Sequence, residues 1–192
     1  MTGSEPALAI ARTQRWLDDV VIGLALCPFA AAPARAGRIA YRVCEDKPAE
    51  AVYQCFLQTL EGFAMADAAQ QETALLIVTE GLADFSEYLD LLALAEQAVS
   101  EAGLTGVIQL ASFHPDYCFA GAPADDPANF TNRSPYPMFH LIREDGLEAA
   151  LASYRHPERI PERNVQRLRA LGLEGIRALQ RQVVGPNDRE AP

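Results

Sequence analysis

Hydrophobic and polar positions follow two different periods over residues 7–112 of the chain. Apolar residues recur three and four positions apart in three segments, which predicts helices at residues 7–26, 49–66 and 84–102. Alternating or continuous apolar runs predict strands at residues 38–44, 74–79 and 107–112. Between the first helix and the first strand, residues 29–37 are expected to form a loop or a short helical turn.

The order strand, helix, strand, helix, strand predicts the fold class. It is typical of an α/β domain with a three- to four-stranded sheet and helices packed on it. A ferredoxin-like arrangement with an added strand is the alternative. One domain is expected over residues 1–184, followed by a frayed tail at residues 185–192.

The periodic pattern stops after the third predicted strand. Residues 114–133 are rich in Pro, Asp, Asn and Gly, and only residues 117–120 indicate a further short strand. An irregular segment of this length inside a compact domain is usually functional or disordered. Its several aromatic residues favour a packed segment over a disordered one.

Regular structure is expected to resume at Ser134. Ser134 as N-cap and Pro135 at the first helical position predict a helix start, and a strand at residues 139–143 is the alternative. Asp145 is placed to cap a further helix. Beyond a proline-bounded link at residues 155–161, two helices split at Gly172 predict a helical C-terminal extension.

Charge excludes some classes of partner. The 192 residues carry a formal net charge of −10, and no Lys or Arg occurs between Lys47 and Arg133. Such a surface repels phosphate backbones and anionic lipids, so neither nucleic acid nor a membrane is expected as a partner. The arginines that follow Ser134 alternate with acids and are interpreted mostly as a solvated helical surface.

No export signal and no apolar run of membrane-spanning length is visible. The four cysteines are far apart and form no CxxC pair, which favours reduced thiols in a cytoplasmic protein. The residues assign neither a cofactor nor an oligomeric state.

His114 is the first candidate for catalysis. It directly follows a predicted strand, and ligands of open α/β sheets bind beyond the carboxyl ends of strands. Asp116 lies two positions further, where its carboxylate can orient the imidazole for acid/base chemistry, with Tyr117 beside the substrate. The alternative is that His114 ends the strand and Asp116 is a turn residue.

A second cluster points to an anion site. His140 and Arg143 share one face if their segment is helical, and Arg133 precedes that helix. Two guanidiniums beside a helix N-terminus would bind a carboxylate or phosphate. The alternative is a surface pair of Arg143 with Glu144 or Asp145, and a core position for His140.

Amides and hydroxyls gather in one short span, at Asn129, Thr131, Asn132 and Ser134. They are candidate groups for orienting a polar ligand. They equally suit the needs of a long loop, whose backbone polar groups must be paired.

Cys27 is a candidate accessory residue, and its role depends on local geometry. At a helix C-terminus the thiol would be less reactive, whereas a helical turn that starts at Pro28 would activate it. A buried position as a small hydrophobe is the further alternative. For a metal, Cys27, His114, Asp116 and His140 or the pair Asp125 and Asp126 are conceivable ligands, but none has a recognised ligand spacing and no metal is assigned.

Several short motifs together resemble those of the DUF1415 family of uncharacterised bacterial proteins. They are Leu26-Cys27-Pro28-Phe29-Ala30, Ser112-Phe113-His114-Pro115-Asp116-Tyr117, Phe119-Ala120-Gly121, Asn132-Arg133-Ser134-Pro135-Tyr136-Pro137 with His140, and Pro161-Glu162-Arg163-Asn164. The resemblance spans about residues 11–171. It implies that Cys27, His114, Asp116, Tyr117, Asn132, Arg133 and His140 are signature positions, but it carries no activity.

The leading functional hypothesis is an enzyme that acts on a small polar or anionic molecule in a pocket formed by residues 112–143. His114 is then the acid/base, Asp116 its orienter, and Arg133 and Arg143 the anion clamp. The alternatives are a metabolite-binding or regulatory module without catalysis, and a metal-binding or redox protein that uses Cys27.

Overall fold

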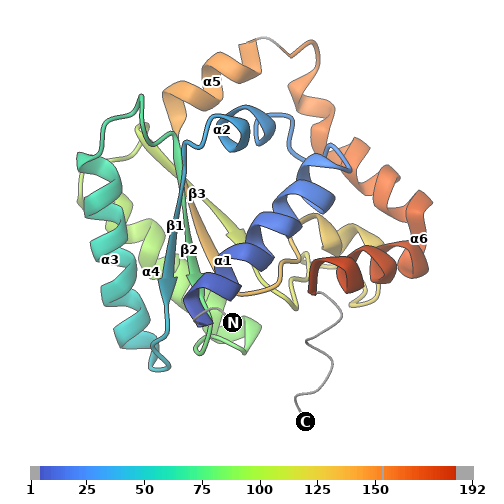
Figure 1. The fold of residues 1–192 in the computed structure, drawn as a ribbon, viewed down its shortest axis with the longest axis horizontal. Coiled ribbons are helices and arrows are strands. Elements are labelled where there is room, and N and C mark those ends of the chain that lie inside the picture. Colours follow the sequence, from blue (N-terminus) through green and yellow to red (C-terminus); the bar gives the residue numbers. More distant parts are fainter. Residues whose placement is uncertain (1–4, 153, 185–192) are drawn as a thin grey trace.

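A computed structural model describes residues 5–152 and 154–184, and it contains a four-stranded mixed sheet (Figure 1). The strands are β1 (Ile39–Cys44), β2 (Thr73–Val78), β3 (Ile108–Phe113) and β4 (Met138–Arg143), in the order β1-β2-β4-β3. The three strands predicted from the first half are confirmed, as is the α/β class. The expected tail at residues 185–192 lies outside the described residues.

Two connections determine the topology. Helix α3 (Ala49–Met65) joins β1 to its parallel neighbour β2. Helix α4 (Phe85–Glu101) joins β2 to β3, and β4 lies antiparallel between those two strands. The unit from β2 to β4 is therefore the split βαβ of ferredoxin-like sheets, but β1 runs parallel to β2 where such a sheet is antiparallel throughout.

The helix predicted to start at Ser134 is wrong, and the alternative strand is correct. Strand β4 pairs along its length with β2 on one side and β3 on the other. Its side chains alternate, so that Phe139 and Leu141 face one layer of the core while Met138 faces the other. Pairing on both edges outweighs the local helix-start signal of Ser134-Pro135, because each ladder satisfies backbone groups that a cap would not.

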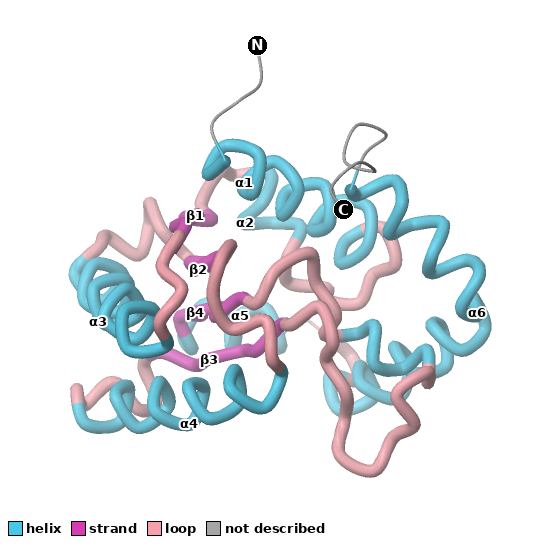
Figure 2. Tube along the Cα trace, turned by 90° about the horizontal axis from the view of Figure 1, so that it is seen from below, coloured by secondary structure: helices cyan, strands magenta, loops and turns pink. Residues whose placement is uncertain are grey.

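Helices cover both faces of the sheet (Figures 1 and 2). On one face α3 and α4 bury Phe56, Phe63 and Tyr88 against Leu76 and the other inward residues of β2. The opposite face is covered by helix α1 (Glu5–Trp16) and the π-helix Leu17–Ile22, and helix α6 (Ile160–Val184) packs against these N-terminal helices. Every residue of β2 is buried, which explains its nearly continuous apolar run.

The remaining elements differ in detail from the expectations. The first predicted helix is α1 followed by the π-helix, and residues 29–37 contain the short helix α2 (Ala31–Arg35). Residues 117–120 form no strand, while Pro127–Thr131 form a 3₁₀ turn. Helix α5 (Glu144–Ala152) follows β4, a 3₁₀ turn spans Pro157–Arg159, and α6 breaks at Gly172 as predicted, with φ of 69°.

Candidate functional site

His114 is fully buried, and both of its ring nitrogens are bound. Nε2 donates to the carbonyl of Leu82 at 2.9 Å, and Nδ1 accepts from the backbone N–H of Asp116 at 3.0 Å. The ring packs against Phe85 and Tyr88, with ring centroids 5.1 and 5.2 Å away. No lone pair or proton of this imidazole remains for a substrate, which favours the alternative role of ending the strand.

The expected carboxylate–imidazole pair is not formed. Asp116 contributes its backbone N–H to His114, as a turn residue does. The ring of Tyr117 contacts Phe85 and Phe119, and its carbonyl accepts from Nε of Arg133 at 2.9 Å. The sequence placed these side chains on one side of an extended strand, but β3 ends at Phe113 and the chain turns there.

Most amides and hydroxyls of the loop satisfy its own backbone, whereas the hydroxyl of Thr131 is buried without a hydrogen-bond partner among the described residues. Asn129 is fully buried, accepts from the N–H of Phe119 at 3.0 Å and donates to the carbonyl of Pro123 at 2.8 Å. Asn132 donates to the carbonyl of Ser112, and Ser134 to that of Tyr136. These groups hold the loop together and leave little for a ligand.

Arg133 belongs to the same backbone network. Its Nε and Nη2 donate to the carbonyls of Tyr117 and Ala124 at 2.9 and 2.8 Å, and the guanidinium lies 4.5 Å from the ring centre of Phe130. The helix N-terminus that was expected to complete an anion clamp beside Arg133 does not exist, because residues 138–143 form β4.

Arg143 satisfies the end of helix α3. Its Nη2 donates to the carbonyls of Phe63 and Ala66 at 2.7 and 2.8 Å, and its Nε donates to that of Gln71 at 3.0 Å. The positive charge meets the negative end of the helix, and the guanidinium also lies over the ring of Phe63. The two arginines of the expected clamp therefore donate to different carbonyls. Arg133 binds the loop after β3, and Arg143 binds the end of α3 and the segment that follows it.

A cavity of about 360 Å³ lies on the sheet face covered by α1 and the π-helix. Its wall is mostly apolar and comes from the N-terminal helices, the sheet and α5: Trp16, Leu17, Val21, Phe29, Leu75, Phe113 and Leu147. Cys27, Thr73 and His140 bring polar atoms to it, and the charged side chains of Glu72 and Arg143 line it as well. The size and the few convergent polar groups are those of small-molecule sites in general.

His140 sits at the base of this cavity, on β4, opposite Leu75 of β2 and Ala111 of β3. The hydroxyl of Thr73 gives its hydrogen to the carbonyl of Leu141 at 2.7 Å, so Nε2 of His140 must donate to the same hydroxyl oxygen. That bond sets the tautomer and leaves Nδ1 as an acceptor. Burial lowers the pKa of His140 to about 4, so the ring is neutral at neutral pH.

Cys27 enters the cavity from the segment between the π-helix and α2. It precedes the turn of residues 28–30, which is the arrangement expected to activate the thiol, and the backbone N–H groups of Phe29 and Ala30 do lower its pKa. Burial is the larger effect and raises the pKa above the ordinary value. Cys27 therefore remains a thiol at neutral pH.

Residues 8–178 match a family model described as a protein of unknown function, DUF1415. The chain belongs to the DUF1415 family. Searches of curated proteins and of solved structures returned no match.

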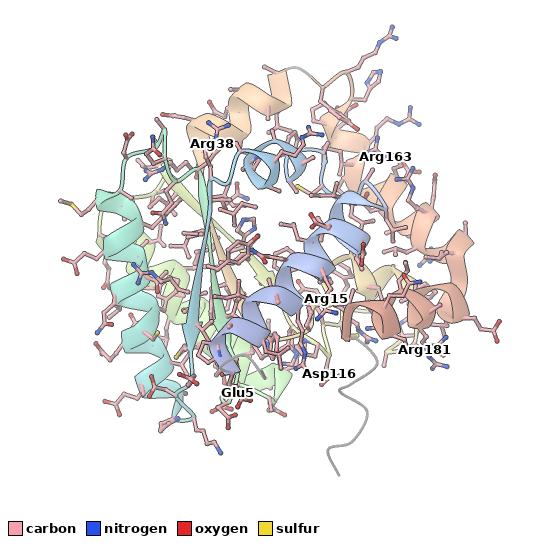
Figure 3. All side chains as sticks on the ribbon, viewed as in Figure 1. Glu5, Arg15, Arg38, Asp116, Arg163 and Arg181 are labelled. Atoms are coloured by element: carbon pink, nitrogen blue, oxygen red, sulfur yellow. The ribbon has the colours of Figure 1, made fainter. Side chains whose placement is uncertain are left out.

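The positions that the resemblance implies to be signature positions fall into two groups. Cys27 and His140 line one cavity. His114, Asp116, Tyr117, Asn132 and Arg133 do not line it and belong to the loop that follows β3. Figure 3 shows Asp116 at the end of the molecule opposite Arg38, whose guanidinium pairs at 3.0 Å with Glu72 of the cavity wall.

Sequence reasoning missed Thr73, Glu72 and Tyr154 as lining residues. Thr73 stands directly before the apolar run of β2, and a hydroxyl at that point was the only available signal. Neither Glu72 nor Tyr154 belongs to a motif that indicates a site.

The conceivable metal ligands are not brought together. His114 packs against α4 on one face of the sheet, whereas His140 faces the cavity on the other. Among residues 5–152 and 154–184, no three His, Cys, Asp or Glu side chains form a group that could hold a metal ion. Within the same residues, no helix has the length and apolar character needed to cross a membrane.

Proposed function

We propose that the protein binds a small, predominantly apolar organic molecule in the cavity that Cys27 and His140 line. The observation that carries this proposal is the cavity itself, which has a volume of about 360 Å³ and is lined mostly by apolar side chains. An apolar ligand that displaces water from such a wall gains roughly 25 cal/mol for each Å² of apolar surface removed from water.

Two polar groups are placed to orient the ligand. Nδ1 of His140 accepts a hydrogen bond, because Nε2 is committed to Thr73. The thiol of Cys27 is a weak donor in the same wall. A ligand with a hydroxyl or amide N–H directed at His140 would satisfy the acceptor, and one without it would leave the acceptor unpaired at a cost of about 1–3 kcal/mol.

The electrostatics favour a binding module over the acid/base enzyme. A general base works best with a pKa near the working pH, whereas burial holds the pKa of His140 at about 4. A nucleophilic cysteine needs a lowered pKa, whereas that of Cys27 is raised. Both groups are therefore uncharged at rest, as hydrogen-bonding groups of a binding site would be.

The proposed setting is the cytoplasm, with no nucleic acid or membrane as partner. It is supported by the net charge of −10 and by four cysteines that are all free thiols.

A cavity-filling variant tests the proposal. Ala111 lines the cavity beside His140, so Ala111→Phe should fill the space, and Ala170→Phe adds the same ring to an exposed position of α6. A metabolite mixture is incubated with each protein, and the retained compounds are identified by mass spectrometry. We expect wild type and Ala170→Phe to retain the same compound unchanged, and Ala111→Phe to retain none.

Two results would contradict the proposal. Equal retention by Ala111→Phe, with its fold verified by circular dichroism, would place the ligand outside the cavity. Release of a chemically altered product by the wild type, but not by His140→Gln, would restore the enzyme hypothesis.

A further inference from the structure

A second hollow lies between the end of α5 and the start of α6. It is lined by Tyr154, Arg155, His156, Arg159, Glu162 and Arg163, together with Gln166. Three guanidiniums therefore face one glutamate here, in a chain whose net charge is −10. The sequence interpretation of these arginines as a merely solvated surface does not account for a concave wall that they share. We call this hollow the arginine cleft.

Arg163 is the arginine of the cleft with buried donors that make no hydrogen bond within the described residues. Nη1 donates to the hydroxyl of Tyr154 at 3.0 Å, but Nε and Nη2 are buried and have no hydrogen-bond partner among the described residues. A buried charged donor without an acceptor is costly, more so than a neutral one. The orphaned nitrogens therefore point to an acceptor that the chain itself does not supply.

The other two arginines of the cleft form no salt bridge with a described carboxylate, although Glu158 interacts electrostatically with Arg159. Within the described residues, neither Arg155 nor Arg159 lies within 4.0 Å of a carboxylate oxygen, and the acid Glu158 pairs with His156 at 3.2 Å. Guanidiniums recognise oxyanions by paired N–H···O bonds, so a carboxylate or a phosphate monoester supplies the missing acceptors.

Tyr154 joins the arginine cleft to the apolar cavity. Its side chain lines both, its hydroxyl accepts from Arg163, and its ring lies edge-on to Phe29 of the cavity wall with centroids 6.2 Å apart. Apolar side chains lie on one side of this tyrosine and guanidiniums on the other. This arrangement suits a molecule with an apolar end and an anionic end.

We infer that the arginine cleft binds the anionic group of the ligand whose apolar part fills the cavity. The ligand class is then an amphipathic small molecule with a carboxylate or phosphate monoester at one end. This inference rests on the proposed function, because it presumes that the cavity is occupied.

Chain-matched probes test the inference by isothermal titration calorimetry. Hexanoate, octanoate and decanoate are compared with the alcohols and the alkyl phosphates of the same lengths. For the chain length that binds best, we expect an anionic probe to bind about tenfold tighter than the alcohol. Tighter binding of the carboxylate or of the phosphate identifies which anion the cleft prefers.

The matched variants are Arg163→Gln and Arg181→Gln. Both remove one positive charge from α6, but Figure 3 shows the two residues at opposite ends of that helix. The advantage of the anion over the alcohol should fall below about threefold in Arg163→Gln and persist in Arg181→Gln. Because Arg163 is partly buried, Arg159→Gln at an exposed position of the cleft provides a second variant, in which the advantage should also shrink.

The outcomes separate this inference from the proposed function. If the alcohol and the anion bind with equal affinity and both lose binding in Ala111→Phe, the cleft does not bind the anionic group. The proposed function of the cavity would still stand. An advantage for the anion that survives in both cleft variants would also overturn the inference. Binding that is unchanged in Ala111→Phe would overturn the proposed function itself.

Discussion

Two regions of this protein contain its distinctive polar residues, and they use them in opposite ways. In the loop of residues 114–134, the side chains of His114, Asn129 and Arg133 form hydrogen bonds with nearby backbone groups. In the cavity, Nδ1 of His140 makes no hydrogen bond within the described residues, and Cys27 keeps its thiol. The dense run of polar residues therefore satisfies the backbone hydrogen bonds of a long loop. The few polar residues on the apolar wall of the cavity are the better indication of a ligand site.

The loop nevertheless supports the cavity. The indole N–H of Trp16 donates to the carbonyl of Arg133 at 3.1 Å, and its ring lies edge-on to Phe113. Both aromatic rings line the cavity. Substitutions in the loop are thus expected to affect the cavity by lowering the stability of the fold. Substitutions in the cavity should leave the structure of the loop unchanged.

The largest effect is expected from His114→Ala. The substitution leaves the carbonyl of Leu82 and the N–H of Asp116 without partners and opens a hole beside Tyr88. We expect the free energy of unfolding, measured by urea denaturation, to fall by about 3–4 kcal/mol. His156→Ala, at an exposed position, should change it by less than about 0.5 kcal/mol. A stable His114→Ala variant would show that the loop histidine is not structural.

A pH titration distinguishes the cavity histidine from the loop. The pKa of His140 is lowered from 6.5 to about 4 in the folded protein, so the unfolded chain binds the extra proton first as the pH falls. Its stabilising contribution is present above pH 6.5 and is lost between pH 6.5 and 4. Relative to His140→Gln, we expect the wild type to lose about 3 kcal/mol over this window. Parallel pH profiles of the two proteins would mean that the ring is not buried in its neutral form.

The next effect concerns Arg143, which the sequence proposed as an anion clamp. Arg143→Gln removes hydrogen bonds to the carbonyls of Phe63, Ala66 and Gln71, so the unfolding free energy should fall by about 2 kcal/mol. Arg143→Lys should recover only part of this loss, because an ammonium cannot reproduce the guanidinium fork. Unchanged thermal denaturation with loss of anion binding would instead support the clamp.

The smallest effect is kinetic. Because burial raises the pKa of Cys27, its alkylation by iodoacetamide at neutral pH should be several-fold slower than that of a free thiol in solution. Octanoate at saturating concentration should slow it further if the cavity is filled. Peptide mapping by mass spectrometry gives the rate at each cysteine, and Cys118, outside the cavity, should show no protection. Faster alkylation of Cys27 than of the free thiol would indicate an activated nucleophile.

Periodicity predicted the elements that are decided locally. The apolar run at residues 74–79 identified β2, and Gly172 identified the break in α6. Ser134-Pro135 gave the wrong element because β4 depends on two partner strands that are distant along the chain. A local start signal carries no information about such pairing.

The candidate site was predictable only in part, for the same reason. His114 and His140 are close in sequence but face opposite sides of the sheet, which only the register of β3 and β4 decides. Cys27 and His140 are far apart in sequence and share a cavity, because the N-terminal helices return across the sheet. Tyr154 could not be anticipated, since its importance comes from its place between two hollows.

The position of β4 also bears on how the chain acquires its fold during synthesis. Strands β2 and β3 leave the ribosome before β4. They are not hydrogen-bonded to each other, because β4 lies between them in the sheet. Until residue 143 has emerged, both strands present open edges, which are the usual templates for aggregation. Nascent chains that stop short of β4 are therefore expected to need chaperones, whereas chains that end after it are not.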